Sequence, residues 1–271
     1  MLLLSWSLLA YRKARRACAA FVLLGVCFAL MMGPADAWGQ KQLRVAAAAD
    51  LQPVMPVLAQ EYEKATGVKL VVSFGSSSTL ATQILNGAPM DIFLGADFTY
   101  PEKVVAGGLA DGSAPTPYAK GTLVLWTRND SKLLPLSMET LTDPRVKTVA
   151  IANELHAPYG RAAAEALRKM HIYDEVAPHF VVGENIAQTA QFVESGNAQL
   201  GLISLTAASS QHFKEIGTYV LVPTSQYSEI HQCAVIMKNS DRKADAHAFL
   251  DWLLSPAVQG SLSSLGLGAV K

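Results

Sequence analysis

Short apolar runs alternate with amphipathic stretches along most of the chain from residue 43 onward. The apolar runs predict strands at residues 43–48, 69–73, 91–94, 121–127, 148–152, 180–182, 200–204 and 229–237. The amphipathic stretches predict helices at residues 50–66, 79–86, 160–171, 186–195 and 241–253, with Pro53 in the first turn of the first helix. This alternation is typical of mostly parallel sheets with helices on both faces, so we predict an α/β protein.

Four of the predicted strands run into their helices through turns made largely of small or hydroxyl residues. The clearest is Gly75–Ser78, where three serines follow a β-branched run, and the others are Ala48–Asp50, His156–Gly160 and Gly183–Ile186. The first amides of a helix lack an internal partner and carry the positive end of its dipole, and serine hydroxyls add donors without net charge. Such turns bind anions. Ordinary capping of the helix by serine is the alternative explanation for any one turn.

Two polar segments that contain proline, Ala114–Lys120 and Pro223–Ser228, divide the chain into a middle block and two ends. We expect residues 38–119 and 228–271 to form lobe I and residues 120–227 to form lobe II, so that the chain crosses between the lobes twice. Two of the four turns fall in each lobe, at the carboxyl ends of its strands. A cleft between such strand ends is a common binding site, where amides from both lobes surround one small ligand.

The beginning of the chain has the features of a secretory signal. Basic residues in Arg12–Arg16 precede an apolar stretch from Ala17 to Met32, and Gly33–Ala37 supplies small residues at a cleavage site. The apolar stretch is short for a membrane span. We therefore expect residues 1–37 to be a signal peptide that is removed on export, which predicts a periplasmic protein.

Removal of residues 1–37 changes the charge and the cysteine content. The remaining 234 residues carry 18 basic and 21 acidic side chains, a net charge of about −3. Nucleic acids and anionic membranes bind basic patches, so this charge argues against both as partners. Cys233 is then the single cysteine, which excludes an intrachain disulfide. Its place in an apolar run predicts a small buried hydrophobic side chain.

Sequence signatures of enzymes are poor in this chain. No nucleophile elbow, phosphate-binding loop or dinucleotide fingerprint is present, and the six histidines show no metal-ligand spacing. Ser240–Lys243 fits a Ser-x-x-Lys pattern, but it lies in a polar stretch that predicts a loop and a helix cap. Ser77 has no base assignable from the sequence. We expect no catalytic residue, no direct metal-ion ligand and no cofactor, although an exported hydrolase on an α/β frame is an alternative.

Six segments of the sequence resemble the periplasmic molybdate-binding proteins of ABC transporters. These segments are Leu43–Leu51, Ser73–Leu80, Asn86–Asp97, Tyr118–Trp126, Ala157–Gly160 and Gly183–Gln188. They occur in order along essentially the whole chain after the signal. The resemblance implies a two-lobed periplasmic-binding-protein fold of type II, in which each lobe is a mostly parallel sheet flanked by helices. It also implies a receptor that binds a tetrahedral oxyanion, molybdate or tungstate, in the cleft and delivers it to a membrane permease. We expect this receptor to be a monomer that closes on its ligand.

The resemblance further implies which residues bind the ligand. The family's positions fall on Ala49 and Asp50 in the first turn, Ser77 in the second, the backbone amide of Tyr159 in the third and that of Ile186 in the fourth. The chain departs from the family at two positions. Asp50 stands where serine or asparagine is common, and Ser204 stands where some members have tyrosine.

Asp50 has two interpretations, because a carboxylate beside a dianion is unfavourable unless it is protonated or turned away. We favour the interpretation that Asp50 caps its own helix, for which aspartate is well suited. In the other interpretation Asp50 faces the ligand and holds or accepts a proton. The same residue leaves open a receptor of this fold for another anion, such as sulfate, a phosphate-like anion, or a ferric or organic anion.

Overall fold

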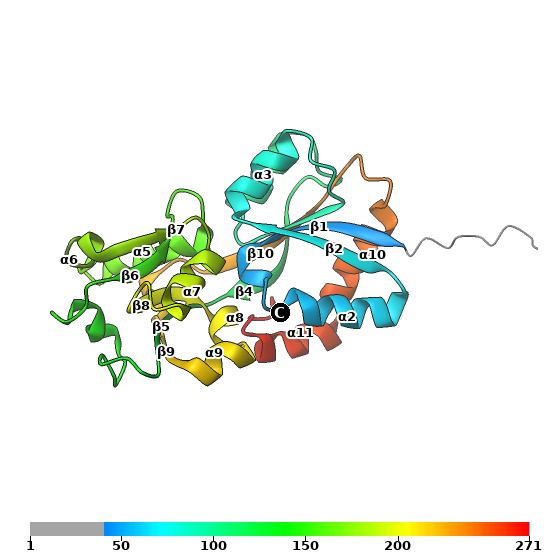
Figure 1. The fold of residues 1–271 in the computed structure, drawn as a ribbon. Helices are drawn as coiled ribbons and strands as arrows, with labels where there is room; N and C mark the ends of the chain where they lie inside the picture. Colours follow the sequence, from blue (N-terminus) through cyan, green and yellow to red (C-terminus); the bar gives the residue numbers. More distant parts are fainter. Residues whose placement is uncertain (1–40, 271) are drawn as a thin grey trace, which may run out of the picture. The chain divides into compact units, whose positions relative to one another are not determined.

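The computed structural model describes residues 41–270, and the predicted signal peptide, residues 1–37, lies outside them. The described part of the chain contains two sheets of five strands each, which we call sheet 1 and sheet 2 (Figure 1). None of the helices in residues 41–270 combines the length and the apolar character that crossing a membrane requires.

Sheet 1 has the strand order β2-β1-β3-β10-β4. Its strands are β1 (Gln42–Ala48), β2 (Lys69–Gly75), β3 (Ile92–Gly95), β4 (Thr116–Gly121) and β10 (Ile230–Ile236). β1 is parallel to both β2 and β3, whereas β10 is antiparallel to β3 and β4. Val45–Ala48 in the centre of the sheet is buried, as a strand covered on both faces requires.

Sheet 2 has the order β7-β6-β8-β5-β9 and repeats the pairing pattern of sheet 1. Its strands are β5 (Leu123–Arg128), β6 (Val149–Ala152), β7 (Phe180–Gly183), β8 (Leu200–Ser204) and β9 (Gly217–Leu221). β6 is parallel to β7 and β8, whereas β5 is antiparallel to β8 and β9. The prediction of an α/β fold with mostly parallel central strands is therefore confirmed.

Separate sets of helices pack on the two sheets (Figure 1). Those that contact sheet 1 are α2 (Met55–Thr66), α3 (Ser77–Leu85), α4 (Thr99–Ala106) and α10 (Lys243–Leu253), with α11 (Pro256–Ser261) beside α10. Those of sheet 2 are α5 (Pro158–Lys169), α7 (Ile186–Glu194), α8 (Leu205–Ala208) and α9 (Gln211–Ile216), with α6 (Tyr173–Val176) beside α5. Five short 3-10 helices complete the assignment in the described residues: η1 (Ala49–Leu51), η2 (Met138–Thr142), η3 (Ala177–His179), η4 (Thr224–Gln226) and η5 (Leu262–Leu265).

Two predicted elements differ from the structure. The segment Ala114–Lys120, predicted as a polar connection, contains most of β4. β4 is an edge strand whose Pro117 lies opposite Cys233 at a register shift, and an edge strand with a bulge accommodates proline. The helix predicted at residues 50–66 begins only at Met55, and Pro56, rather than Pro53, lies in its first turn.

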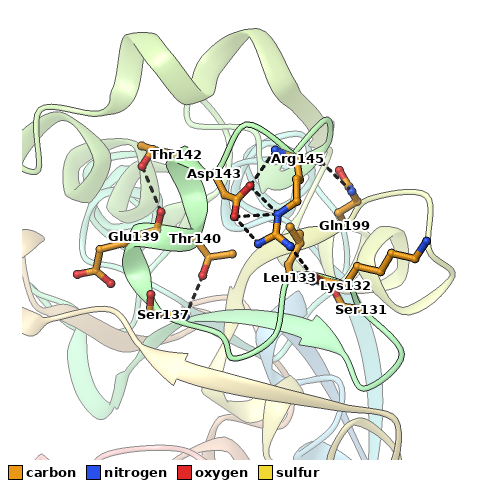
Figure 2. Close-up of polar contacts among 10 residues, drawn as sticks. All are labelled: Ser131, Lys132, Leu133, Ser137, Glu139, Thr140, Thr142, Asp143, Arg145 and Gln199. Atoms are coloured by element: carbon orange, nitrogen blue, oxygen red, sulfur yellow. Dashed lines mark hydrogen bonds and ion pairs between the residues drawn. The ribbon is translucent and has the colours of Figure 1, made fainter.

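The connection between β5 and β6 is folded by polar side chains (Figure 2). The Arg145 guanidinium pairs with Asp143, with Nε 2.9 Å from Oδ1, and donates to the Lys132 carbonyl oxygen at 2.9 Å. The Gln199 side chain accepts from the amide of Thr148 at 3.2 Å and donates to the Arg145 carbonyl oxygen. These contacts fix the chain where it enters β6, whose other end leads to the candidate site.

Candidate functional site

A small cavity lies where the ends of strands from both sheets meet. It is lined by Ala48, Ala49, Asp50, Gly75, Ser76, Ser77, Ala96, Ala157, Pro158, Tyr159, Asn185 and Ile186. All five residues predicted to bind ligand are in this set, and they come from the four turns that the sequence singled out. The cavity volume is about 10 Å³, room for about one water molecule, so a larger ligand requires the surrounding turns to separate.

The turn after β2 divides capping and ligand-facing roles between two serines. Ser76 is the N-cap of α3, and its hydroxyl oxygen accepts from the Thr79 amide at 3.1 Å. Ser77 is the first residue of the helix and is buried, and its hydroxyl oxygen accepts from the Ala96 amide at 3.0 Å. Among the described residues no acceptor takes the Ser77 hydroxyl proton. That proton is therefore available to an anion in the cavity.

The turns that begin α7 and α5 leave backbone amides available in a similar way. Asn185 caps α7 through Oδ1, which accepts from the amides of Ala187 and Gln188 at 3.0 Å each, and the cap does not use the amide of Ile186. α5 begins with Pro158, and no side chain caps it, so the amide of Tyr159 is left without a cap. These amides lie at the positive ends of helices of nine and twelve residues.

Close packing brings Tyr159 against both sheets. A Cβ atom at Gly160 would lie 2.2 Å from the Ala152 carbonyl oxygen, so glycine lets α5 begin directly beside the end of β6. A Cβ atom at Gly121 would lie 2.3 Å from the Tyr159 hydroxyl oxygen. The two glycines therefore allow the Tyr159 ring to reach from α5 to the place where β4 ends.

The preferred interpretation of Asp50, as a helix cap, is wrong. The N-cap of η1 is Ala48, and no side chain caps that helix. The Asp50 side chain is instead 1% exposed, and its Oδ2 accepts from Gln232 Nε2 and from the Tyr159 hydroxyl, the latter at 3.2 Å. Its Oδ1 is buried and has no partner among the described residues. The carboxyl turns away from its own helix because buried donors from β10 and α5 converge on it.

Gln232 is the site residue that the sequence reasoning missed. Its side chain is fully buried in β10, where Nε2 donates to Asp50 and also lies 3.3 Å from the Tyr159 hydroxyl oxygen. Its Oε1 accepts from the Tyr118 hydroxyl at 2.8 Å. A glutamine inside the apolar run of β10 was the available signal, since buried polar side chains need partners. Thr206 also escaped notice, and its hydroxyl donates to the Asp50 carbonyl oxygen at 2.6 Å.

Burial sets the ionisation of this network. Desolvation raises the pKa of Asp50 to about 7, although the hydrogen bonds from Gln232 and Tyr159 oppose the rise. Desolvation and the nearby Asp50 charge raise the pKa values of Tyr118 and Tyr159 well above 10, so both phenols stay neutral donors. Among residues 41–270, no ion pair involves Asp50, so no cation holds its charge.

The other residues considered from the sequence lie outside this network or support it. Cys233 is buried, and burial raises the pKa of its thiol to about 12, which fits a small hydrophobic side chain. Ser240 donates to Asp91 at 2.7 Å, and Ser204 caps α8. His156 is exposed and is not a lining residue. The described residues contain no group of three or more histidine, cysteine or acidic side chains arranged to hold a metal ion.

The cavity is suited to holding an anion by neutral donors. It offers a serine hydroxyl from α3 on sheet 1, helix-terminal amides from α5 and α7 on sheet 2, and a carboxyl whose pKa lies near neutrality. Nucleophilic chemistry requires a base next to the nucleophile. In the described part of the chain, the hydrogen-bond partner of the Ser77 hydroxyl is a backbone amide and not a base.

Comparison with known proteins shows which family the chain resembles. The profile of a family described as bacterial extracellular solute-binding protein matches residues 43–267. The chain is 34% identical over 228 residues to the molybdate-binding protein ModA of Rhodobacter capsulatus, a match that covers 84% of this chain and 88% of that protein. It is 36% identical over 228 residues to ModA of Azotobacter vinelandii, with 84% and 90% covered.

Solved structures give the same picture at the level of the fold. The periplasmic molybdate-binding protein of Azotobacter vinelandii superposes with a TM-score of 0.78 at 31% identity, covering 84% of this chain and all of that one. The sulfate-binding protein SubI of Mycobacterium tuberculosis H37Rv superposes with a TM-score of 0.73 at 14% identity, covering 85% of this chain and 88% of that one. At that identity the similarity concerns the fold alone.

Proposed function

Because the chain belongs to the bacterial extracellular solute-binding proteins, and within them to the molybdate-binding ModA proteins, we propose that it captures a tetrahedral oxyanion outside the cytoplasm and delivers it to an ABC permease. The proposed ligand is molybdate or tungstate. One observation carries this proposal: the four turns predicted from the sequence line a single cavity and contribute donors from both sheets. Ala49, Asp50, Ser77, Tyr159 and Ile186 are the proposed ligand-binding residues.

The kind of donor supports an oxyanion of this type. A tetrahedral dianion offers acceptors in several directions, and hydroxyl and amide donors from different elements satisfy them without a salt bridge. Ser77 contributes a free hydroxyl proton, and Tyr159 and Ile186 contribute amides at helix N-termini. We propose accordingly that the protein is a binding protein and not an enzyme, and that molybdate is its cargo and not a cofactor.

The proposed mechanism is closure of two lobes on the ligand. We assign residues 38–119 and 228–271 to lobe I and residues 120–227 to lobe II, with Lys120 and Gly121, the last residues of β4 in sheet 1, at the boundary. The passage of the chain from β4 in sheet 1 to β5 in sheet 2, and back from β9 to β10, supports two hinge crossings. Contacts across the cleft, Arg161 to Asp97 and the Tyr100 hydroxyl to the Leu155 carbonyl oxygen at 2.7 Å, favour the closed form.

The remaining parts of the proposal concern location and assembly. The periplasmic relative and the signal features of residues 1–37 favour a periplasmic location. We propose that the protein is a monomer there and docks on a membrane permease. X-ray scattering with and without saturating molybdate tests the closure. A ligand that contacts both lobes binds the closed form more tightly, so we expect a smaller radius of gyration on binding. An unchanged radius contradicts closure, and a doubled mass contradicts the monomer.

A thermal-unfolding panel tests the ligand class directly. The purified protein without its signal is heated with molybdate, tungstate, sulfate, phosphate, chromate or ferric citrate. A ligand that binds only the folded state adds RT ln(1 + [L]/Kd), roughly 4 kcal/mol at a thousandfold excess over Kd. We expect molybdate and tungstate to raise the melting temperature most. A rise with ferric citrate alone, or with none of the anions, contradicts the proposed function.

A further inference from the structure

Asp50 has one oxygen that the protein uses and one that it leaves free. Oδ2 accepts from Gln232 and Tyr159, which come from β10 and α5. Oδ1 is buried, and no described residue donates to it or accepts from it. Since Asp50 lines the same cavity as Ser77, Tyr159 and Ile186, Oδ1 is the Asp50 atom left for a ligand.

An ionised Asp50 is incompatible with a bound dianion. A carboxylate next to a second negative charge in a buried site raises the free energy of the complex, because neither water nor a cation offsets the repulsion. A neutral carboxyl reverses the interaction, since its O–H group donates a hydrogen bond to the anion. The arrangement of partners suits the neutral form: two donors point at Oδ2, and Oδ1 is free to carry the hydrogen.

We propose that Asp50 takes part in the oxyanion site as a protonated carboxyl, whose Oδ1–H group donates to the anion, so that capture of a dianion takes up one proton from solvent. This inference rests on the proposed function, because it requires that an oxyanion occupies this cavity. The step forms the O–H bond on Asp50 and breaks no bond in the ligand. It makes Asp50 a residue that sets the pH dependence of affinity.

The groups that hold the Asp50 side chain do not titrate near neutral pH. Tyr159 on α5 and Tyr118 on β4 are neutral phenols with raised pKa values, and Gln232 on β10 does not ionise. On the helices that pack against η1, Thr206 of α8 is neutral and Glu194 of α7 pairs with His212 at 2.7 Å.

The charged groups near this network are already paired or protonated. Arg161 of α5 pairs with Asp97, and the pair lines a separate cavity of about 280 Å³ that shares Ala96 and Pro158 with the anion cavity. The Cys233 thiol, beside Gln232 on β10, has its pKa raised to about 12. The Cys233 thiol therefore stays protonated between pH 6 and pH 9. Burial also raises the pKa of Asp97, which its Arg161 partner opposes, and burial raises the pKa of Asp50 to about 7.

The proposal predicts how much proton uptake and affinity change with pH. With a free-state pKa of about 7, binding at pH 8 takes up about 0.9 proton per anion, and binding at pH 6 takes up about 0.1. Affinity for a dianion falls about tenfold between pH 6 and pH 8, and about tenfold again by pH 9. Molybdate itself stays a dianion over this range, so the slope reports the protein.

Calorimetry in buffers of different ionisation enthalpy measures the proton uptake. Molybdate is titrated into the wild type and into Asp50→Asn at pH 8, because asparagine supplies a permanent N–H donor in place of the protonated carboxyl. We expect close to one proton per anion for the wild type, none for Asp50→Asn, and nearly constant affinity of the variant from pH 6 to pH 9. Ser77→Ala is the matched control, and it should bind more weakly while it keeps the uptake.

The other outcomes separate the two proposals. Tight binding by the wild type without proton uptake, or uptake that persists in Asp50→Asn, overturns the inference and leaves the proposed function standing. Absence of molybdate and tungstate binding at every pH overturns the proposed function itself. If Asp50→Asn does not fold, Asp50→Ser provides the same comparison. An infrared difference spectrum of the wild-type complex adds a second readout, and an ionised carboxylate signal for Asp50 puts the proton on the anion and contradicts the proposal.

Discussion

The turns after β1 and β2 lie at one edge of sheet 1, and they present different chemistry to the same cavity. After β2, Ser76 caps the helix and Ser77 presents a hydroxyl, so the turn carries no ionisable side chain. After β1, no side chain caps the helix, and Asp50 presents a buried carboxyl. The turn after β2 suits an anion at any pH, whereas the turn after β1 suits a dianion only when its carboxyl is neutral. One cavity thus combines a donor that does not depend on pH, the Ser77 hydroxyl, with the Asp50 carboxyl, whose charge depends on pH.

The comparison also shows a conflict between stability and charge. A buried polar group costs free energy unless its hydrogen bonds are made, and an unpaired buried charge costs more. Ser77 is buried with a partner for its oxygen and carries no charge, so its turn buries no unpaired charge in the absence of ligand. Asp50 is buried with one oxygen unpartnered, so its ionised form raises the free energy of the folded state. Protonation of the carboxyl removes this cost. Substitutions at Asp50 should therefore change how stability and affinity depend on pH, whereas substitutions at Ser77 should change affinity equally at every pH.

The largest expected effect is on stability, in Asp50→Asn. The folded-state pKa of about 7 lies above the value of 3.8 for an unperturbed aspartate, so the native state holds a proton that the unfolded state releases. The free energy of unfolding of the wild type therefore falls as pH rises from about 4 to about 7, and then levels off. Between pH 5 and pH 9 the wild type should lose about 3 kcal/mol relative to Asp50→Asn. Urea unfolding without ligand measures this, and parallel pH curves for the two proteins contradict it.

The next effect is on affinity, in Ser77→Ala. The change removes a hydroxyl donor to the oxyanion, a hydrogen bond to a charged group worth about 1.5–3 kcal/mol. Affinity for molybdate should fall by roughly one to two powers of ten. The loss should be the same at pH 6 and pH 8, because serine does not titrate in this range. Wild-type affinity in calorimetry removes the Ser77 side chain from the site, and a loss that varies with pH contradicts the contrast between the turns.

The sequence was sufficient to predict the turns, because their chemistry is local. A glycine or small residue, a capping side chain and the first helical amides occupy a few consecutive positions, as in Gly75–Ser77 and Asn185–Ile186. The lining of one cavity by all four turns followed from the rule that parallel strands end at the same edge. The alternation of strands and helices similarly predicted the parallel strands at the centre of each sheet. The edge strand β4, which contains proline, was mistaken for a connection.

The role of Asp50 was not predictable from its neighbours in sequence. Aspartate at the start of a helix is an ordinary cap, and that local preference favoured the wrong interpretation. Its actual partners are Tyr159 and Gln232, which lie 109 and 182 residues further along the chain. Burial then decides its ionisation, and burial depends on the packing of both sheets. Tertiary contacts therefore override the local signal at this position.

Gln232→Leu sharpens the contrast by changing the hydrogen-bond network that holds the Asp50 carboxyl and leaving the turn after β2 unchanged. The change removes the donor that stabilises the ionised carboxylate through Oδ2, so the pKa of Asp50 should rise further. A loss of one hydrogen bond to the charged form corresponds to about one pH unit, or about 1.4 kcal/mol. The midpoint at which molybdate affinity begins to fall should move up by about that amount. Titrations from pH 6 to pH 9 measure it. An unchanged midpoint in a folded variant means that Gln232 does not set the ionisation of Asp50.

The smallest expected effect is in Ser76→Ala, which separates capping from binding within the β2 turn. Ser76 accepts from the Thr79 amide as the N-cap of α3, and loss of such a cap costs about 1 kcal/mol of the free energy of unfolding. Ser77 is the next residue and carries the proposed contact to the anion, so Ser76→Ala is matched to Ser77→Ala in chemistry and in place. We expect Ser76→Ala to lower stability in urea at every pH and to weaken molybdate binding far less than Ser77→Ala does. If the two variants lose the same affinity, the turn binds the anion through its backbone shape, and the separate role of the Ser77 hydroxyl is wrong.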